Sequence, residues 1–185
     1  MPLDAIELLE SYKTMLYHWN TIHSLSGAKD IEQIQKNIEN SLFPLQSIDF
    51  SKKRLLLDVG SGNGFPAIPL HIILKIPTIL CEPNAKKAAF LQNIKAHLKL
   101  THLSIERKKI EHLKLQTLPD CITSRATFPI ALLLEKCKHC IQKDTLLVLY
   151  KGSNVENEIP KGLKHLRFSK NLLQYIVIYG KDILC

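Results

Sequence analysis

Apolar residues in the first quarter of the chain recur at the three- and four-residue spacing of amphipathic helices. They are Leu8, Leu9, Tyr12, Met15, Leu16 and Trp19 in one stretch, and Ile31, Ile34, Ile38 and Leu42 in the next. Asp30 suits the N-cap of the second helix and Pro44 ends it. We therefore expect residues 1–48 to form a helical extension in front of a second unit, residues 49–185.

In that second unit, short apolar runs alternate with helical patterns. The runs read as strands are residues 54–59, 78–81, 103–106, 121–124 and 145–150, followed by a closing pair at 164–169 and 174–179. Helices are expected to about Leu74, from Asn84 to about Leu98, and over about residues 128–141. Alternation of this kind predicts an α/β fold, a doubly wound, mostly parallel sheet covered by helices on both faces.

The most informative segment is a glycine-rich loop that follows the first of these strands. Gly60, Gly62 and Gly64 occupy alternate positions, where the backbone turns sharply and approaches a ligand closely. A dinucleotide site needs its third glycine where this chain has Phe65. Asp58 precedes the loop, and a carboxylate there suits an ammonium and a sulfonium better than a pyrophosphate. The loop favours S-adenosylmethionine, and a nicotinamide oxidoreductase is the least favoured reading.

Acidic residues after the next two strands extend this cofactor site. Glu82 ends the second strand, where a carboxylate accepts hydrogen bonds from both hydroxyls of a ribose. A ribose does not by itself distinguish between cofactors, and a solvated strand end is the alternative interpretation. By analogy with such folds, we expect the adenine to lie against Ile110 and Glu111.

The end of the fourth strand narrows the choice of methyl acceptor. It reads Thr123-Ser124-Arg125-Ala126, which lacks the Asn/Asp-Pro-Pro-aromatic motif of enzymes that methylate exocyclic amines. The Pro-Cys pair used for C5-methylation of pyrimidines is also absent. Guanine N7 has a free lone pair and needs neither device, so alignment would supply most of the catalysis. We expect Arg125 to hold a guanine edge or a phosphate, and Lys151 to meet a phosphate or remain a solvated lysine.

Composition adds a class of partner. The chain holds 25 Lys and Arg against 17 Asp and Glu, a net charge of +8, which favours a polyanion such as RNA, although a solvated basic surface is the alternative. The five cysteines and the absence of a signal-like start point to a cytoplasmic protein without a disulfide framework. No apolar run predicts a membrane span, and Cys137-Lys-His-Cys140 lacks the second ligand pair of a zinc site, so no metal is expected.

The motifs together resemble a known family, the bacterial 16S rRNA guanine-N7 methyltransferases (glucose-inhibited division protein B family). The resemblance begins at Asp58 and runs to Leu70, where Pro66 and the Ile68-Pro69-Leu70 run are more specific than a generic glycine motif. It continues through Met15-Leu16-x-x-Trp19-Asn20, Lys86-Lys87-x-x-Phe90-Leu91, Ser124-Arg125-Ala126, Lys151-Gly152 and Glu158-Ile159.

This resemblance implies a Rossmann-like class I methyltransferase sheet with an antiparallel last strand. It implies methylation at N7 of guanine 527 of 16S rRNA, and cofactor contacts at Gly60, Phe65, Glu82, Ile110, Glu111 and Arg125. We add Asp58, Gly62 and Gly64 to the cofactor site, and expect Arg125, Lys109 and Lys151 to position the nucleotide.

The chain departs from the family pattern mainly where the substrate is expected. The departures include Ser24-Leu25-Ser26, Lys36, Asn37, Asn40, Lys109 and Gln174. A lysine in place of an arginine keeps the charge but loses the planar fork. We expect a monomer that acts on 16S rRNA or the small ribosomal subunit. A small-molecule methyltransferase and a non-catalytic RNA-binding assembly factor are the alternatives.

Overall fold

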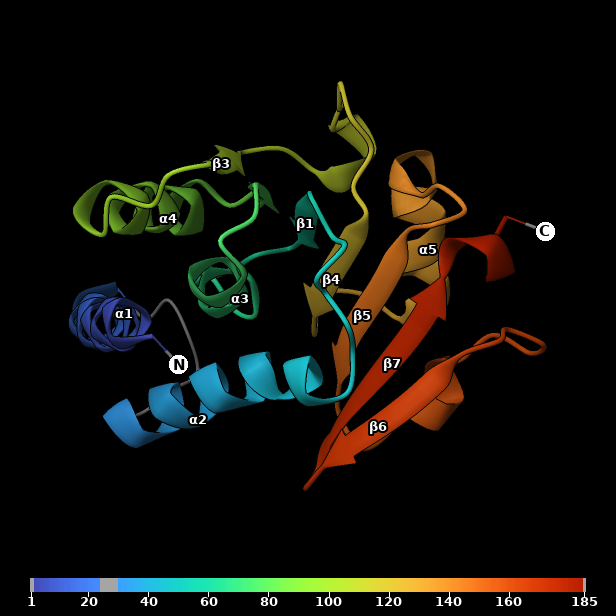
Figure 1. Cartoon of the computed structure of the whole chain (residues 1–185), viewed down its shortest axis with the longest axis horizontal. Coiled ribbons are helices and arrows are strands. Elements are labelled where there is room, and N and C mark those ends of the chain that lie inside the picture. Colours follow the sequence, from blue (N-terminus) through green and yellow to red (C-terminus); the bar gives the residue numbers. More distant parts are fainter. Residues whose placement is uncertain (1, 24–29, 185) are drawn as a thin grey trace.

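The protein forms a single seven-stranded sheet with strand order β3-β2-β1-β4-β5-β7-β6 (Figure 1). The computed structural model describes residues 2–23 and 30–184. The strands are β1 (Leu56–Val59), β2 (Thr78–Cys81), β3 (Leu103–Glu106), β4 (Cys121–Arg125), β5 (Leu146–Lys151), β6 (Leu166–Lys170) and β7 (Leu173–Tyr179). Strands β1 to β5 run parallel to one another, and β7 pairs antiparallel with both β5 and β6. This confirms the predicted doubly wound α/β sheet.

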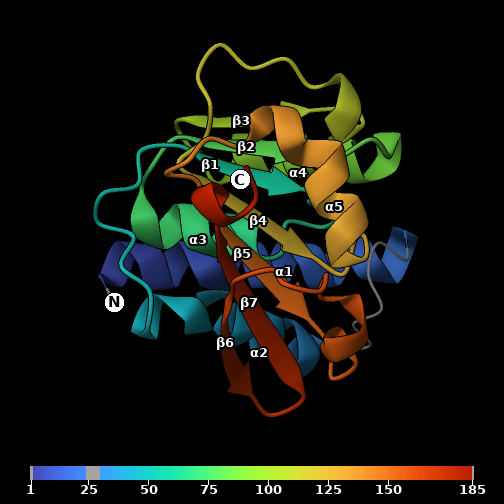
Figure 2. The same ribbon diagram turned by 90° about the vertical axis from the view of Figure 1, so that its right-hand side faces the viewer.

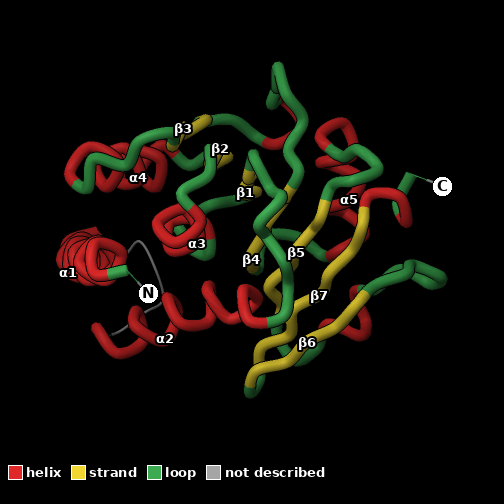
Figure 3. The backbone as a smooth tube through the Cα atoms, viewed as in Figure 1, coloured by secondary structure: helices red, strands yellow, loops and turns green. Residues whose placement is uncertain are grey.

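Helices cover both faces of this sheet (Figures 2 and 3). They are α1 (Leu3–His23), α2 (Ile31–Leu42), α3 (Ala67–Leu74), α4 (Ala85–His97) and α5 (Ile130–Cys137), with short 3-10 turns between some elements. Along β5, Leu147 and Leu149 pack with α5, whereas Val148 faces the opposite side, toward α2 and α3. Parallel strands that are buried on both faces need such continuous apolar runs, and β5 is buried throughout.

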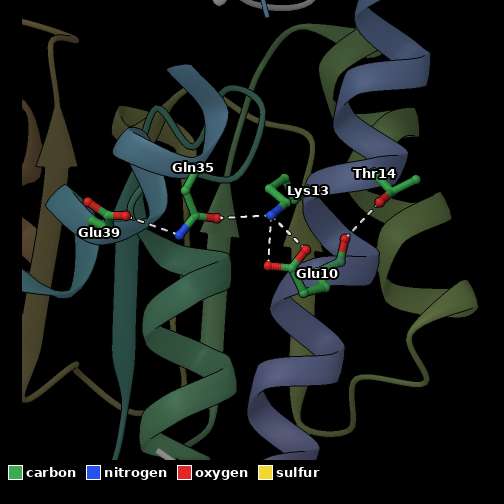
Figure 4. A network of polar contacts seen from close by, with 5 residues as sticks. All are labelled: Glu10, Lys13, Thr14, Gln35 and Glu39. Atoms are coloured by element: carbon green, nitrogen blue, oxygen red, sulfur yellow. Dashed lines mark hydrogen bonds and ion pairs between the residues drawn. The ribbon is translucent and has the colours of Figure 1, made fainter. Parts of the chain in front are cut away.

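The two N-terminal helices pack into the same core as the sheet. Tyr12 and Leu16 of α1, and Ile34 and Ile38 of α2, share one hydrophobic cluster with Phe90 of α4. Polar contacts between the helices add to this packing, since Lys13 of α1 donates to Gln35 of α2 (Figure 4). The division of the chain into two units at residue 48 stays a prediction. In the structure, α1 and α2 share a hydrophobic cluster with α3, α4 and the sheet.

Local sequence explains where most of the helices begin. The Asp30 side chain accepts a hydrogen bond from the backbone N–H of Gln33, and Asn84 caps α4 in the same way through Lys86 and Lys87. The helix expected over residues 128–141 is shorter, because α5 follows Pro129 and gives way to a 3-10 turn at Lys138. The first strand begins two residues later than expected, at Leu56.

Among the described residues, no helix is both long and apolar enough to cross a membrane. The same part of the chain holds no cluster of three or more His, Cys, Asp or Glu side chains arranged to bind a metal ion. Cys81, Cys121, Cys137 and Cys140 are buried free thiols. Burial raises the pKa of the Cys81 thiol to about 12, so it stays protonated near neutral pH.

Candidate active site

The glycine loop lies at the carboxyl ends of β1 and β2, the edge of a parallel sheet where ligands bind. The backbone N–H of Gly60 donates to the carbonyl oxygen of Cys81 at 2.9 Å, which ties the loop to β2. Gly60 has a φ of +73°, and a Cβ there would lie 2.5 Å from the side chain of Thr127. The position therefore admits glycine alone without a shift of its neighbours.

Glu82 is oriented by two backbone donors. Its Oε2 accepts from the N–H of Gly62 at 2.7 Å, and its Oε1 accepts from the N–H of Asn84 at 2.8 Å. The residue is 5% exposed and lines the main cavity. A carboxylate has about four lone-pair sites, so one on each oxygen remains for a further donor. The predicted ribose acceptor is thus pre-oriented at the cavity wall.

Asp58 is fully buried beneath the loop. Its Oδ1 accepts from the hydroxyl of Thr123 at 2.6 Å, while its Oδ2 has no hydrogen-bond partner among the described residues. Burial raises the pKa of this carboxyl from 3.8 to about 7, against the lowering effect of the Thr123 and Ser61 hydroxyls. A buried carboxylate of this kind is stabilised by any cation that approaches the loop.

Two cavities open beside the loop and share part of their walls. The larger, of about 640 Å³, is lined by Phe65, Glu82 and Arg125 among others. The smaller, of about 220 Å³, is lined mainly by apolar atoms and includes Ile110. Gly60, Pro83 and Thr127 line both. An elongated ligand with an apolar ring at one end and polar groups at the other therefore fits across them.

The smaller cavity contains the residues expected around an adenine. Ile110 is buried, and Glu111 and Lys109 also line this cavity. Glu111 forms an ion pair with Lys136 of α5, and this hydrogen bond lowers the pKa of Glu111. The side chain of Cys81 closes the wall by donating to the Lys108 carbonyl.

Arg125 crosses from the end of β4 to the N-terminal helices. Its Nη2 donates to Oδ1 of Asn37 on α2 at 2.6 Å, and its guanidinium carbon lies 5.5 Å from the centre of the Phe65 ring. Its Nη1 is buried without a partner among the described residues, and burial lowers the pKa of Arg125. Asn37 is one of the expected departures from the family pattern, but no local pattern in the sequence indicates this contact, which joins residues far apart in the chain.

Helix α1 contacts the glycine loop and Phe65 through Tyr12. The Tyr12 hydroxyl donates to the backbone carbonyl of Asn63 at 2.8 Å, and its ring lies edge-on to Phe65 at 5.5 Å. Burial raises the pKa of Tyr12 well above 10, so the phenol remains a neutral donor. The N-terminal extension thus holds the glycine loop in place.

Lys151 lies apart from the main cavity. Its Nζ donates to the carbonyl of Phe128 and to Oε2 of Glu158, each at 2.5 Å. The lysine is 7% exposed, so it is not a solvated surface residue. Of the other departures, residues 24–26 lie outside the described residues, Lys36 is exposed, and Gln174 accepts from Arg167 on β6 at 2.8 Å.

The structure brings most of the predicted site residues together. Gly60, Gly62, Phe65, Glu82 and Arg125 line the larger cavity, whereas Lys109, Ile110 and Glu111 line the smaller one. Asp58 and Gly64 line neither cavity: Asp58 is buried before the loop, and at Gly64, within the loop, a Cβ would meet Ile68 at 2.6 Å.

Comparison with solved structures identifies the fold. The ribosomal protein L11 methylase of Lactobacillus delbrueckii subsp. bulgaricus has a TM-score of 0.62 at 12% identity, with 77% of each chain covered. Coclaurine N-methyltransferase, solved with S-adenosylhomocysteine, has a TM-score of 0.52 at 19% identity, over 81% of this chain and 43% of the other. At these identities the likeness shows a shared methyltransferase fold.

Sequence comparison is more specific. A ribosomal RNA small subunit methyltransferase G from Campylobacter jejuni subsp. jejuni (strain 81-176) is 38% identical over 93% of this chain and 90% of its own length. The protein of that name from Helicobacter bizzozeronii is 42% identical over 82% of this chain and 84% of its own. The family profile GidB, rRNA small subunit methyltransferase G, matches residues 5–182. The chain therefore belongs to this family, the S-adenosylmethionine-dependent enzymes that methylate N7 of a guanine in 16S rRNA.

Proposed function

We propose that the chain methylates N7 of guanine 527 of 16S rRNA, with the cofactor across the two cavities and the acceptor beside Arg125. The observation that carries this proposal is the pair of cavities that meet at Gly60, with Glu82 on one wall and Arg125 on another. The position 527 and several of the residue roles come from the family resemblance, and the arrangement of the cavities supports those roles.

The residues around the loop fit S-adenosylmethionine. The two lone-pair sites left on Glu82 match the two hydroxyls of a ribose, and the apolar cavity at Ile110 matches an adenine. The buried carboxylate of Asp58 favours the cationic methionine end, and the glycines allow it to lie close to the backbone. When bound, the cofactor supplies a methyl group on a cationic sulfur.

The protein's share of the reaction is alignment. Guanine N7 carries no proton, so the site needs no general base, and the barrier falls mainly because acceptor and donor are held in line. Arg125 is suited to this task, since Asn37 and Phe65 fix its guanidinium on two sides. We expect Arg125 to orient the acceptor nucleotide, and Lys109 at the cavity rim to meet a phosphate.

The substrate is expected to be RNA within the small ribosomal subunit, bound by a monomer in the cytoplasm. The net charge of +8 supports a phosphate backbone as the larger part of the contact. Affinity for RNA should then fall steeply as the salt concentration rises. RNA binding that does not respond to salt would contradict this part of the proposal.

The decisive experiment is transfer of a labelled methyl group from S-adenosylmethionine to small ribosomal subunits that lack this modification, followed by mapping of the labelled base. We expect one N7-methylguanine, at position 527. Label at another guanine would overturn the position. Tight cofactor binding without any transfer would favour the non-catalytic assembly factor, and transfer to free metabolites without RNA would favour the small-molecule enzyme.

A further inference from the structure

A third hollow lies next to the main cavity, between the segment after β4 and the turn after β5. It has a volume of about 280 Å³, and its walls include Phe128, Lys151, Gly152 and Glu158. Ala126 and Thr127 line both this hollow and the 640 Å³ cavity that contains Arg125. A planar group that enters the main cavity beside Arg125 can therefore extend into the hollow.

The hollow is built around a charged pair that packing alone does not require. Lys151 is 7% exposed and its Nζ lies 2.5 Å from Oε2 of Glu158, whose side chain is 32% exposed. Burying a lysine ammonium has a desolvation cost that a single ion pair seldom outweighs. Because this ion pair lies beside a ligand cavity, recognition of a ligand explains its burial better than stability does.

Both partners keep hydrogen-bonding capacity. The ammonium of Lys151 has three N–H groups and uses two of them, on Glu158 and on the Phe128 carbonyl. Glu158 accepts this bond through Oε2, and its Oε1 has no hydrogen bond among the described residues. The hollow therefore offers one cationic donor next to one anionic acceptor.

We propose that Lys151 and Glu158 read the Watson–Crick edge of the acceptor base and so select guanine, an inference that rests on the proposed function. That edge presents O6 as an acceptor, followed by N1–H and the 2-amino group as donors. Lys151 donates to O6, while Glu158 accepts from N1–H and the 2-amino group. This assignment replaces the expected contact of Lys151 with a phosphate.

The order of the two charges makes the site selective. Lys151 is tied to Phe128, in the segment that also lines the cofactor cavities, and Glu158 lies beyond it. A base whose N7 faces the methyl donor places position 6 nearer that segment than positions 1 and 2. Guanine then sets O6 against Lys151, whereas adenine would set its 6-amino donor against the ammonium. A site with paired polar groups rejects such a mismatch strongly.

The test compares guanosine with inosine at the acceptor position of reconstituted small subunits. Inosine keeps N7, O6 and N1–H and lacks the 2-amino group, so it removes one donor to Glu158. For the native protein we expect inosine to lower kcat/KM for labelled-methyl transfer about tenfold, the loss of one hydrogen bond to a charged group. For Glu158→Ala the guanosine-to-inosine ratio should fall to about one.

Glu156→Ala is the matched control. Glu156 belongs to the same 3-10 turn, and it pairs with Arg167 on β6. This variant should keep the tenfold ratio. Glu158→Gln, which preserves size and a partner for Lys151, serves as a second variant and should also lose the preference. The ratio does not depend on how much protein is folded, so general damage cannot imitate the result.

Two outcomes would overturn the inference: a native enzyme that accepts both nucleosides equally, or a ratio that Glu158→Ala and Glu158→Gln leave unchanged. Neither would affect the proposed function, which requires only transfer to guanosine. If the native protein transfers no methyl group to either subunit, the proposed function itself fails, and the two failures are thus distinguishable.

Discussion

The two halves of the active site are built in different ways. On the cofactor side, a short stretch of chain supplies the glycines, and backbone N–H groups hold Glu82. On the acceptor side, side chains hold one another: Arg125 bonds to Asn37 on α2, 88 positions away, and Lys151 bonds to Glu158 in the turn that follows β5. The first half depends on the end of a sheet, and the second on how helix α2 and the turn after β5 are placed.

The two halves should also differ in how much substitution they tolerate. Lys36, Asn37 and Gln174, where we expect the chain to depart from the family pattern, lie outside the glycine loop, whereas Lys109 lines the smaller cavity. The glycine loop tolerates little change, because an added Cβ at Gly60 or Gly64 would come within 3 Å of packed side chains. Side-chain pairs can be replaced by other pairs of similar reach. Substitutions should therefore separate the halves: one set alters cofactor affinity and the other alters turnover.

Removal of Arg125 should have the largest effect on turnover. Arg125→Ala deletes the fixed guanidinium at the acceptor end, and we expect kcat to fall about 100- to 1,000-fold, as when other preorganised donors are removed. Cofactor affinity, measured by calorimetry, should change little because Glu82 and the loop are untouched. If turnover of Arg125→Ala is unchanged, Arg125 has no part in the mechanism. If the variant loses cofactor binding, the cofactor and acceptor halves are not independent.

The converse prediction concerns Gly60. In Gly60→Ala the new methyl group would lie 2.5 Å from Thr127, at a backbone φ of +73° that alanine adopts with strain. We expect cofactor affinity to fall about 100-fold, which corresponds to about 2.7 kcal/mol. Gly152→Ala is the matched control for this binding measurement, because a Cβ there meets nothing within 4 Å. Equal cofactor affinities for both variants would contradict the role of the loop.

The sequence predicts that the loop residues meet at one sheet edge and that Arg125 lies near them, but it does not predict the contacts that hold Arg125. Asp58 lies near the end of β1, and the glycines and Glu82 follow the ends of β1 and β2, so their meeting at one sheet edge follows from parallel topology alone. The contact between Arg125 and Asn37 depends on where α2 packs, which no local pattern encodes. The shortened α5 has a similar cause, because three residues do not distinguish a 3-10 turn from a helix.

Ionisation of Asp58, in the cofactor half, makes the stability of the protein depend on pH. Its pKa is about 7 in the folded protein against 3.8, so the folded state holds the proton more tightly than the unfolded state does. Ionisation of Asp58 therefore does not lower the free energy of unfolding below about pH 4. It lowers this free energy more and more as the pH rises, and reaches its full effect above about pH 7.

We expect Asp58→Asn to increase the free energy of unfolding by about 2 kcal/mol at pH 8: about 4 from the pKa difference, less about 2 for an unpaired amide. Denaturant unfolding at pH 4 and pH 8 measures this, and the gain should turn into a loss at pH 4, because the cost of the unpaired amide remains when the carboxyl of the native protein is protonated. A gain of the same size at both pH values would rule out ionisation as the cause. Cofactor affinity should fall in this variant at pH 8.

The smallest effect is expected from Asn37, whose contribution is to position Arg125. Asn37→Leu keeps the size of the side chain but removes the oxygen that accepts from Nη2, so the guanidinium can leave its place above Phe65. We expect kcat to fall about tenfold, the loss of one hydrogen bond to a charged group, with cofactor affinity unchanged. Asn37→Asp retains the acceptor and should recover most of the turnover.

Gln35→Leu is the matched control for this change. Gln35 carries another half-buried carboxamide on the same helix, but it bonds to Lys13 and Glu39 (Figure 4). Both leucine variants lose a carboxamide from α2, so a purely structural effect should lower kcat in both. A tenfold loss confined to Asn37→Leu, at equal thermal stability, would show that α2 acts on the acceptor through Arg125. Equal losses would reduce α2 to a structural support.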